Sequence, residues 1–154
     1  MRLIDLLTRG RTTTDLAGTN KTEVLLSLAG LLCDQREGLV VDDVFRALCQ
    51  REELASTGIG VGVGVPHGRV DTVDEVLVAL GVHRRGVDFS APDGKHTGIF
   101  FAVLAPVSKP GVHLKVLARI SRLVRAEQFR ENLRFAEDQS ALLDAVRGAE
   151  MGIS

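Results

Sequence analysis

The chain has 154 residues, with 19 Lys and Arg against 20 Asp and Glu, so its formal net charge is −1 at pH 7. A chain of this length favours one domain with its own core, and we expect residues 1–154 to form a single domain. The charge balance lacks the basic excess that nucleic-acid binding needs. Because no apolar run approaches the ~18 residues of a membrane span and the charged start does not resemble a signal peptide, we expect a cytoplasmic protein without membrane insertion.

The first third of the chain predicts two helices. Residues 1–18 combine a short apolar start with a Thr- and Gly-rich linker. Asn20 can cap a helix that should end before Gly38, because apolar residues recur between them at helical spacing. A second helix is expected to open at Asp42 and to end immediately before a glycine-rich stretch, which would bring Arg51 to the edge of that stretch.

The cysteines and histidines give no metal-binding pattern. Cys33 and Cys49 each fall in a helical pattern and form no C-x-x-C motif, so we expect reduced, packed thiols. The four histidines lack a metal-ligand spacing such as H-E-x-x-H. We therefore expect no metal site.

The glycine-rich stretch at residues 56–69 reads S-T-G-I-G-V-G-V-G-V-P-H-G-R. Its alternation of glycine with a β-branched residue favours one extended strand that Pro66 should end, with His67 presented at the strand end and Gly68 freeing the backbone after it. For His67 two interpretations stay open: a structural loop histidine, or a nucleophile whose other ring nitrogen is held by a peptide carbonyl. The run matches neither the dinucleotide fingerprint nor the phosphate-loop motif, so we expect no nucleotide cofactor.

The second half of the chain alternates strand and helix patterns. The apolar runs 76–83 and 99–104 are typical of strands buried on both faces of a sheet. A helix should start at Pro110, and two shorter helices fit residues 127–136 and 140–146. Strands between helices predict an α/β or α+β fold.

Three further histidines remain to be placed. His113 falls in the first turn of the helix predicted from Pro110, whose buried side should include Leu114. A helix start favours anions, so His113 is either part of an anion site or a surface or capping residue. His83 and His96 lie in polar surroundings and are predicted to be solvated.

The sequence T-G-I-G-V-G-V-G-V-P-H-G at Thr57 to Gly68 resembles the active-site signature T-G-I-G-x-G-x-x-x-P-H-G. That signature belongs to enzyme IIA components of the bacterial phosphoenolpyruvate-dependent sugar phosphotransferase system (PTS), of the fructose/mannitol type, which includes the stand-alone nitrogen-regulatory enzyme IIA. The resemblance covers the chain from about residue 3 to residue 146. Equivalents are also present for Arg51-Glu52, for V-D-F-S-A-P-D-G at 87–94 and for His113-Leu114.

The resemblance implies an α/β fold in which helices flank a mixed sheet. It implies that His67 accepts a phosphoryl group from a phosphohistidine carrier of the HPr type, with no cofactor. His113 and Arg51 would form the polar surroundings of the phosphoryl group, with Thr57 and Gly68 as further supports. Onward partners would be an enzyme IIB, or a regulated transporter or kinase.

Three functional alternatives stay open. The absence of an adjoining IIB or transporter segment favours the regulatory nitrogen branch over a sugar-specific IIA, and a third alternative is a non-catalytic interaction module of the same fold. The family often has Asn where this chain has Val61, which removes a possible polar support of the loop. Because a carrier protein must reach His67, we expect a shallow depression with an apolar rim formed by the glycine–valine run.

Overall fold

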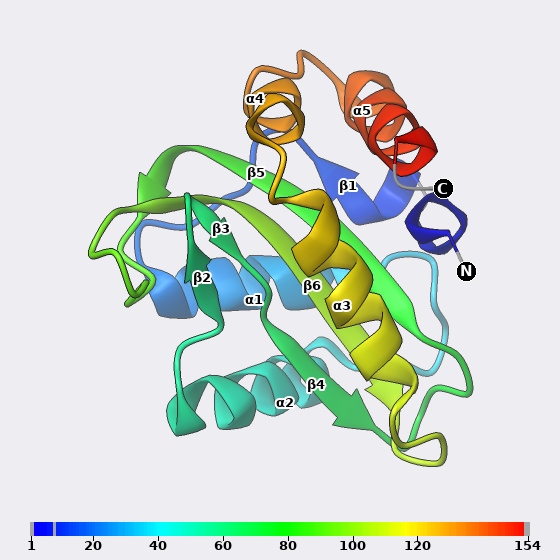
Figure 1. Ribbon diagram of the computed structural model, residues 1–154. Coiled ribbons are helices and arrows are strands. Elements are labelled where there is room, and N and C mark those ends of the chain that lie inside the picture. The colour runs from blue at the N-terminus through cyan, green and yellow to red at the C-terminus, as the bar shows by residue number, and fades with distance from the viewer. Residues whose placement is uncertain (1, 8, 153–154) are drawn as a thin grey trace.

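The computed structural model describes residues 2–7 and 9–152, in which helices cover both faces of a mixed β-sheet, as predicted (Figure 1). The helical elements are η1 (Leu3–Leu6), η2 (Arg9–Arg11), α1 (Lys21–Leu32), α2 (Val41–Leu54), α3 (Val112–Leu123), α4 (Glu127–Arg134) and α5 (Gln139–Met151). The strands are β1 (Thr12–Thr13), β2 (Gly58–Gly60), β3 (Val63–Gly64), β4 (His67–Val70), β5 (Leu77–Val87) and β6 (Thr97–Pro106).

Strand β6 organises the sheet. The strand order is β1-β5-β6-β3-β2, and β4 also pairs with β6. β6 runs antiparallel to β5 and parallel to both β3 and β4, so the two short strands line one edge of it in succession. In this register His67 lies opposite Val103, the first of the four residue pairs that join β4 to β6.

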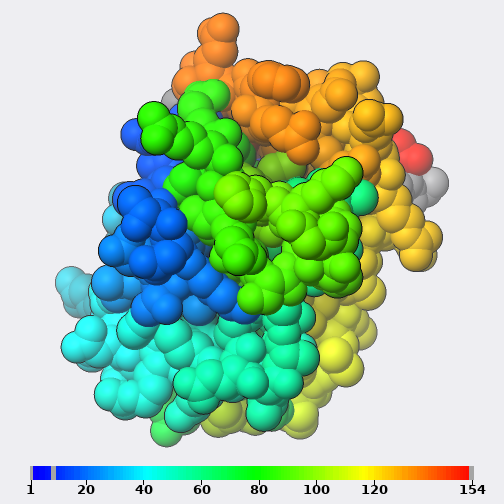
Figure 2. All heavy atoms as spheres, turned by 90° about the vertical axis from the view of Figure 1, so that its left-hand side faces the viewer, coloured from blue at the N-terminus to red at the C-terminus, as the bar shows by residue number. Residues whose placement is uncertain are grey.

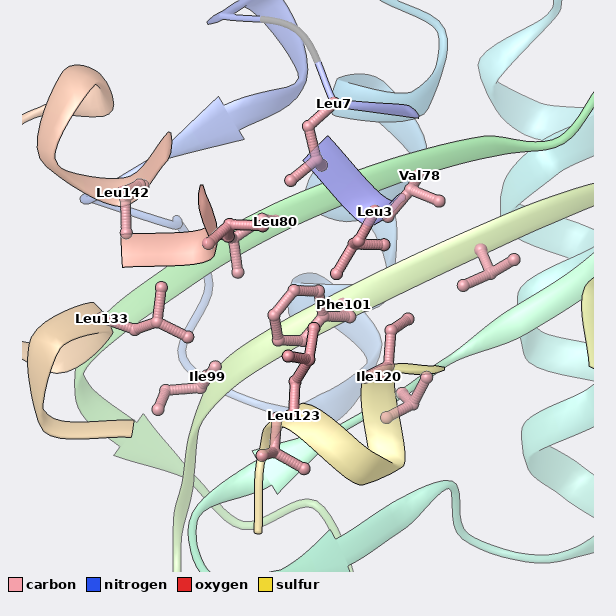
Figure 3. Close-up of a cluster of buried hydrophobic side chains, with 14 of the residues drawn as sticks. Leu3, Leu7, Val78, Leu80, Ile99, Phe101, Ile120, Leu123, Leu133 and Leu142 are labelled. Carbon is pink, nitrogen blue, oxygen red and sulfur yellow. The ribbon is translucent and has the colours of Figure 1, made fainter. Parts of the chain in front are cut away.

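The side chains of β6 alternate between two cores, because successive residues of a strand point to opposite faces. Phe101 and Val103 belong to the cluster covered by η1, α3, α4 and α5, whose side chains converge in Figure 3. Phe100 and Ala102 belong to the cluster covered by α1 and α2. Burial on both faces explains the near-continuous apolar runs in the sequence.

The glycine-rich stretch forms a hairpin, so the prediction of one long strand was wrong. Its turn is Val61-Gly62, where φ is +53° and +81°, as in the two-residue turns whose twist matches that of paired strands. A positive φ is unusual for a β-branched residue, and the Val61 N–H donates to Asp93 Oδ2 at 3.1 Å. In Figure 2 the yellow-green β5–β6 connection, which contains Asp93, spreads over this side of the molecule between α2 and the orange α4. A carboxylate thus supports the turn that lacks an Asn.

Pro66 interrupts the chain between β3 and β4. It has no N–H to donate to the ladder, and only its carbonyl takes part, accepting the Val103 N–H at 3.0 Å. His67 therefore opens a new strand, whereas the sequence predicted it at a strand end.

Three local predictions change in the structure. The predicted N-terminal linker contains β1, which pairs in parallel with β5. The second helix begins at Val41, one residue before the predicted Asp42. Leu114, expected on the buried side of α3, is 59% exposed, whereas Val116 is buried. Asn20 does cap α1, accepting the Glu23 N–H at 2.9 Å.

We predict that Gly68→Ala destabilises the fold although Gly68 has no positive φ. A Cβ at Gly68 would lie 3.1 Å from the carbonyl and Cβ atoms of Ala47, so α2 would have to shift. The free energy of unfolding should fall by about 1–3 kcal/mol, as in other overpacked sites. Gly30→Ala is the matched control: nothing lies within 4 Å of a Cβ there, inside α1, and stability should rise by up to about 1 kcal/mol. Urea titration of both variants checks this, and equal stabilities would contradict the close approach.

Candidate functional site

Three elements converge on an open depression of about 460 Å³. Arg51 comes from the end of α2, His67 and Gly68 from the start of β4, and His113 from the first turn of α3. In Figure 1, β4 lies between α2 and α3. The fold thus brings together four of the five residues that the sequence singled out. The remaining lining residues are Ala47, Gln50, Leu54, Arg69 and Val107.

The imidazole of His67 is held by one hydrogen bond. Its Nδ1 lies 2.8 Å from the carbonyl oxygen of Val65. A carbonyl oxygen can only accept, so Nδ1 carries the ring proton and donates it. Nε2 then has the lone pair and is the nitrogen free to react. This is the arrangement that nucleophilic histidine chemistry requires, with the acceptor two residues before the histidine.

The surroundings of His67 keep its ring neutral. Burial, which disfavours the charged form, is the main cause that lowers the pKa of His67, and the positive charge of Arg51 and the ring of His113 lower it further. The hydrogen bond to Val65 and the carboxylate of Glu52 act in the opposite direction but do not outweigh burial. A neutral imidazole is the nucleophilic form, so the lowered pKa of His67 favours that form at neutral pH.

His113 stacks beside His67. The two ring centroids are 6.4 Å apart with an interplanar angle of 25°. The pKa of His113 is lowered by burial and then by the charge of Arg69. Its Nδ1 is buried and has no hydrogen-bond partner among residues 2–7 and 9–152. A neutral His113 can donate one ring N–H to a group bound on its neighbour.

The guanidinium of Arg51 is tethered at the depression. Arg51 is in the last turn of α2, and its Nη1 donates to the carbonyl of Ala55 at 3.0 Å. This bond uses one of five N–H donors and leaves the planar fork suited to an oxyanion.

Thr57, the fifth predicted site residue, lies outside this lining. It is buried, its N–H donates to Glu52 Oε1 at 2.9 Å, and its hydroxyl donates to Glu52 Oε2 at 2.5 Å. Lys21 Nζ lies 2.7 Å from the same carboxylate. The Thr57 hydroxyl therefore joins the hairpin to α2 and α1, which is a structural role, and its donated hydrogen is not directed to a phosphoryl group.

The rim of the depression differs from the expectation. Val61 and Gly62 of the glycine–valine run line a separate hollow beside α4 with Asp93. The apolar side chains at the site are Leu54, which is 81% exposed, and Val107, which is 48% exposed. Leu54 ends α2 and Val107 follows β6, so only the fold brings these two side chains to His67.

The other two histidines are used differently. His83, predicted to be solvated, is half-buried: its Nε2 donates to the Gly18 carbonyl at 2.6 Å and its Nδ1 accepts the Gly86 N–H at 3.0 Å. His96 is exposed.

Cys33 and Cys49 are free thiols, as predicted. Over the described ranges we find no group of three or more potential metal ligands. Within those ranges, too, each helix is too short or too polar to cross a membrane.

Comparison with known sequences identifies the family that this chain matches. The model described as the phosphoenolpyruvate-dependent sugar phosphotransferase system, EIIA 2, matches residues 5–148. A nitrogen regulatory protein of Pseudomonas aeruginosa is 31% identical over 152 residues, 99% of each chain. A nitrogen regulatory protein of Bradyrhizobium diazoefficiens is 37% identical over 99 residues, which are 64% of this chain and 65% of that protein. A fructose-specific EIIA component of Haloferax volcanii is 36% identical over 105 residues, 68% of each.

Solved structures agree with this grouping. Nitrogen regulatory protein IIA-Ntr from Neisseria meningitidis superposes with a TM-score of 0.86 at 30% identity, covering 94% of this chain and 98% of that one. Enzyme IIA for mannitol from Escherichia coli, solved in complex with phosphorylated enzyme IIB, has a TM-score of 0.78 at 21% identity, covering 92% and 97%. The second likeness shows the fold alone.

We predict that His67 titrates below the 6.5 of an unperturbed imidazole. As the pH falls through this lowered pKa, the proton occupies Nε2, so phosphoryl acceptance should decline only in acid. Arg51→Gln removes a positive neighbour and should raise the pKa of His67 toward 6.5. Arg125→Gln, an exposed change in the turn after α3, is the control and should leave the pKa of His67 unchanged. NMR titration of the ring protons measures both, and a His67 pKa above 6.5 would refute the prediction.

Proposed function

This chain belongs to the EIIA 2 family of the phosphoenolpyruvate-dependent sugar phosphotransferase system, and we propose that it accepts the phosphoryl group on Nε2 of His67. EIIA components of this system are phosphotransfer carriers. The observation that carries the assignment to His67 is the bond from Nδ1 to the Val65 carbonyl, which leaves Nε2 as the free nitrogen.

The proposed step is a transfer between two imidazoles. The lone pair on Nε2 of His67 attacks phosphorus, the N–P bond of the donor phosphohistidine breaks, and its electron pair stays on the donor ring. Each ring keeps the proton on its far nitrogen, which in His67 is Nδ1, so the step is balanced without an acid or base. Phosphoryl transfer depends mainly on positioning and on stabilising spread negative charge. Arg51 and His113 line the depression with His67, which supports assigning the second task to them.

The proposed donor is a phosphohistidine carrier of the HPr type. An N–P bond is already activated, so this transfer requires no nucleotide. The depression is open and bordered by Leu54 and Val107, which suits a small, transient contact of less than about 1,200 Å². Gly68, which lines the depression, carries no side chain that would hinder the approaching ring.

The proposed role is regulatory, in the nitrogen branch. Its support is the full-length likeness to a nitrogen regulatory protein and the likeness to the IIA-Ntr structure. In that role the phosphorylation state is the signal, read by a transporter, a kinase or another regulator.

A sugar-specific role is the second candidate. The fructose-specific relative supports it, and in the fold relative from Escherichia coli the IIA protein binds phosphorylated IIB. Here His67 would pass the group to a cysteine of enzyme IIB. Rapid loss of phosphate from the phosphorylated chain to a purified fructose IIB would favour this role over the regulatory one.

The test is phosphoryl incorporation from phosphoenolpyruvate, enzyme I and an HPr-type carrier, followed by intact mass. His67→Ala should take up no phosphate, because the nucleophile is absent. His113→Ala should slow uptake by roughly 10- to 1000-fold, the range for one stabilising donor. His96→Ala, at an exposed position outside the depression, is the control and should match the wild type. Full incorporation in His67→Ala, or none in the wild-type chain, would contradict the proposal; the latter would leave a non-catalytic interaction module.

A further inference from the structure

Arg69 shares the depression with His67, although sequence analysis did not single it out. Both residues lie in β4, two positions apart, so their side chains leave the strand on the same face. Two residues of a strand span about 6.6 Å, well within the reach of an arginine side chain. Both side chains line the same hollow.

The guanidinium of Arg69 has no partner. Over residues 2–7 and 9–152 it forms neither a hydrogen bond nor an ion pair that meets the usual distance limits, whereas Arg51 donates to Ala55 and Arg119 forms a fork on Glu150. Its charge nevertheless acts on the site, since it lowers the pKa of His113. An unpaired cation therefore lines the depression together with His67 and His113.

We propose that Arg69 binds the oxygens of the phosphoryl group on His67, together with Arg51. This inference rests on the proposed function. A phosphoryl group on Nε2 carries about two negative charges near neutral pH, which one tethered guanidinium matches only in part. Arg69 supplies a second planar guanidinium to the phosphoryl oxygens, and it need not give up an existing ion pair to do so. Because the group is present in both the transferring and the phosphorylated states, Arg69 should affect the rate of uptake and the lifetime of the product.

The experiment uses phosphoramidate as the donor, a small molecule that needs no protein docking, alongside the enzyme I and HPr-type system. The full chain is compared as wild type, Arg69→Gln, Arg69→Lys, Arg125→Gln and His67→Ala. Arg125 is exposed in the turn after α3 and is not among the residues that line the depression. Arg125→Gln therefore removes the same charge outside the site. Loss of a charge-assisted bond should slow uptake by Arg69→Gln roughly 10- to 100-fold with either donor. Arg69→Lys should recover part of the rate, and Arg125→Gln should keep all of it.

A second readout separates phosphate binding from folding. The ³¹P resonance of phosphorylated His67 should shift in Arg69→Gln and its hydrolysis should quicken, with the melting temperature unchanged because Arg69 is exposed. Rates for Arg69→Gln equal to those for Arg125→Gln would overturn the inference while leaving His67 as the acceptor. Slowing with the protein donor alone would also overturn it, making Arg69 a docking residue. Uptake by His67→Ala, or none by the wild type with either donor, would instead defeat the proposed function.

Discussion

The hydrogen bond from Nδ1 of His67 to the Val65 carbonyl is the contact on which the site depends. It exists because Pro66 breaks the ladder between β3 and β4, so the carbonyl before it turns toward the ring that follows while both short strands stay paired with β6. One bond fixes the tautomer, the ring orientation and the identity of the free nitrogen. Without it, either nitrogen of the imidazole could carry the proton, and the neighbouring cations would have no defined target.

The rest of the fold positions Arg51 and His113 around the ring of His67. Gly68 lets α2 approach β4 closely enough for Arg51 to reach the depression, and Glu52, the next residue, anchors the hairpin through Thr57. On the other side, the loop after β6 sets the start of α3 so that His113 stacks beside His67. The cores on the two faces of the sheet thus act as rigid supports for three side chains from distant parts of the sequence.

Sequence analysis singled out His67 and Gly68 because they fall in a long motif, and Arg51 and His113 because equivalents of both are present in the family. The apolar runs predicted the central strands, and residues at helical spacing predicted the helices. It missed the hairpin, since a glycine and β-branched alternation suits one strand equally well and Val61-Gly62 lacks the Asn-Gly or Asp-Gly pair that usually marks such a turn. The hydroxyl of Thr57 is bonded to Glu52, a contact that the motif alone could not indicate. Arg69 could have been found from the two-residue period of a strand, had β4 been placed after Pro66.

The most direct test of this account is the position of phosphorus on the ring. The chain is labelled with ¹⁵N-histidine and phosphorylated, and ³¹P–¹⁵N and ¹H–¹⁵N couplings are recorded by NMR. The account predicts phosphorus on Nε2 of His67, with the proton retained on Nδ1 because the Val65 carbonyl still accepts it. Phosphorus on Nδ1, or on another histidine such as His113, would contradict it.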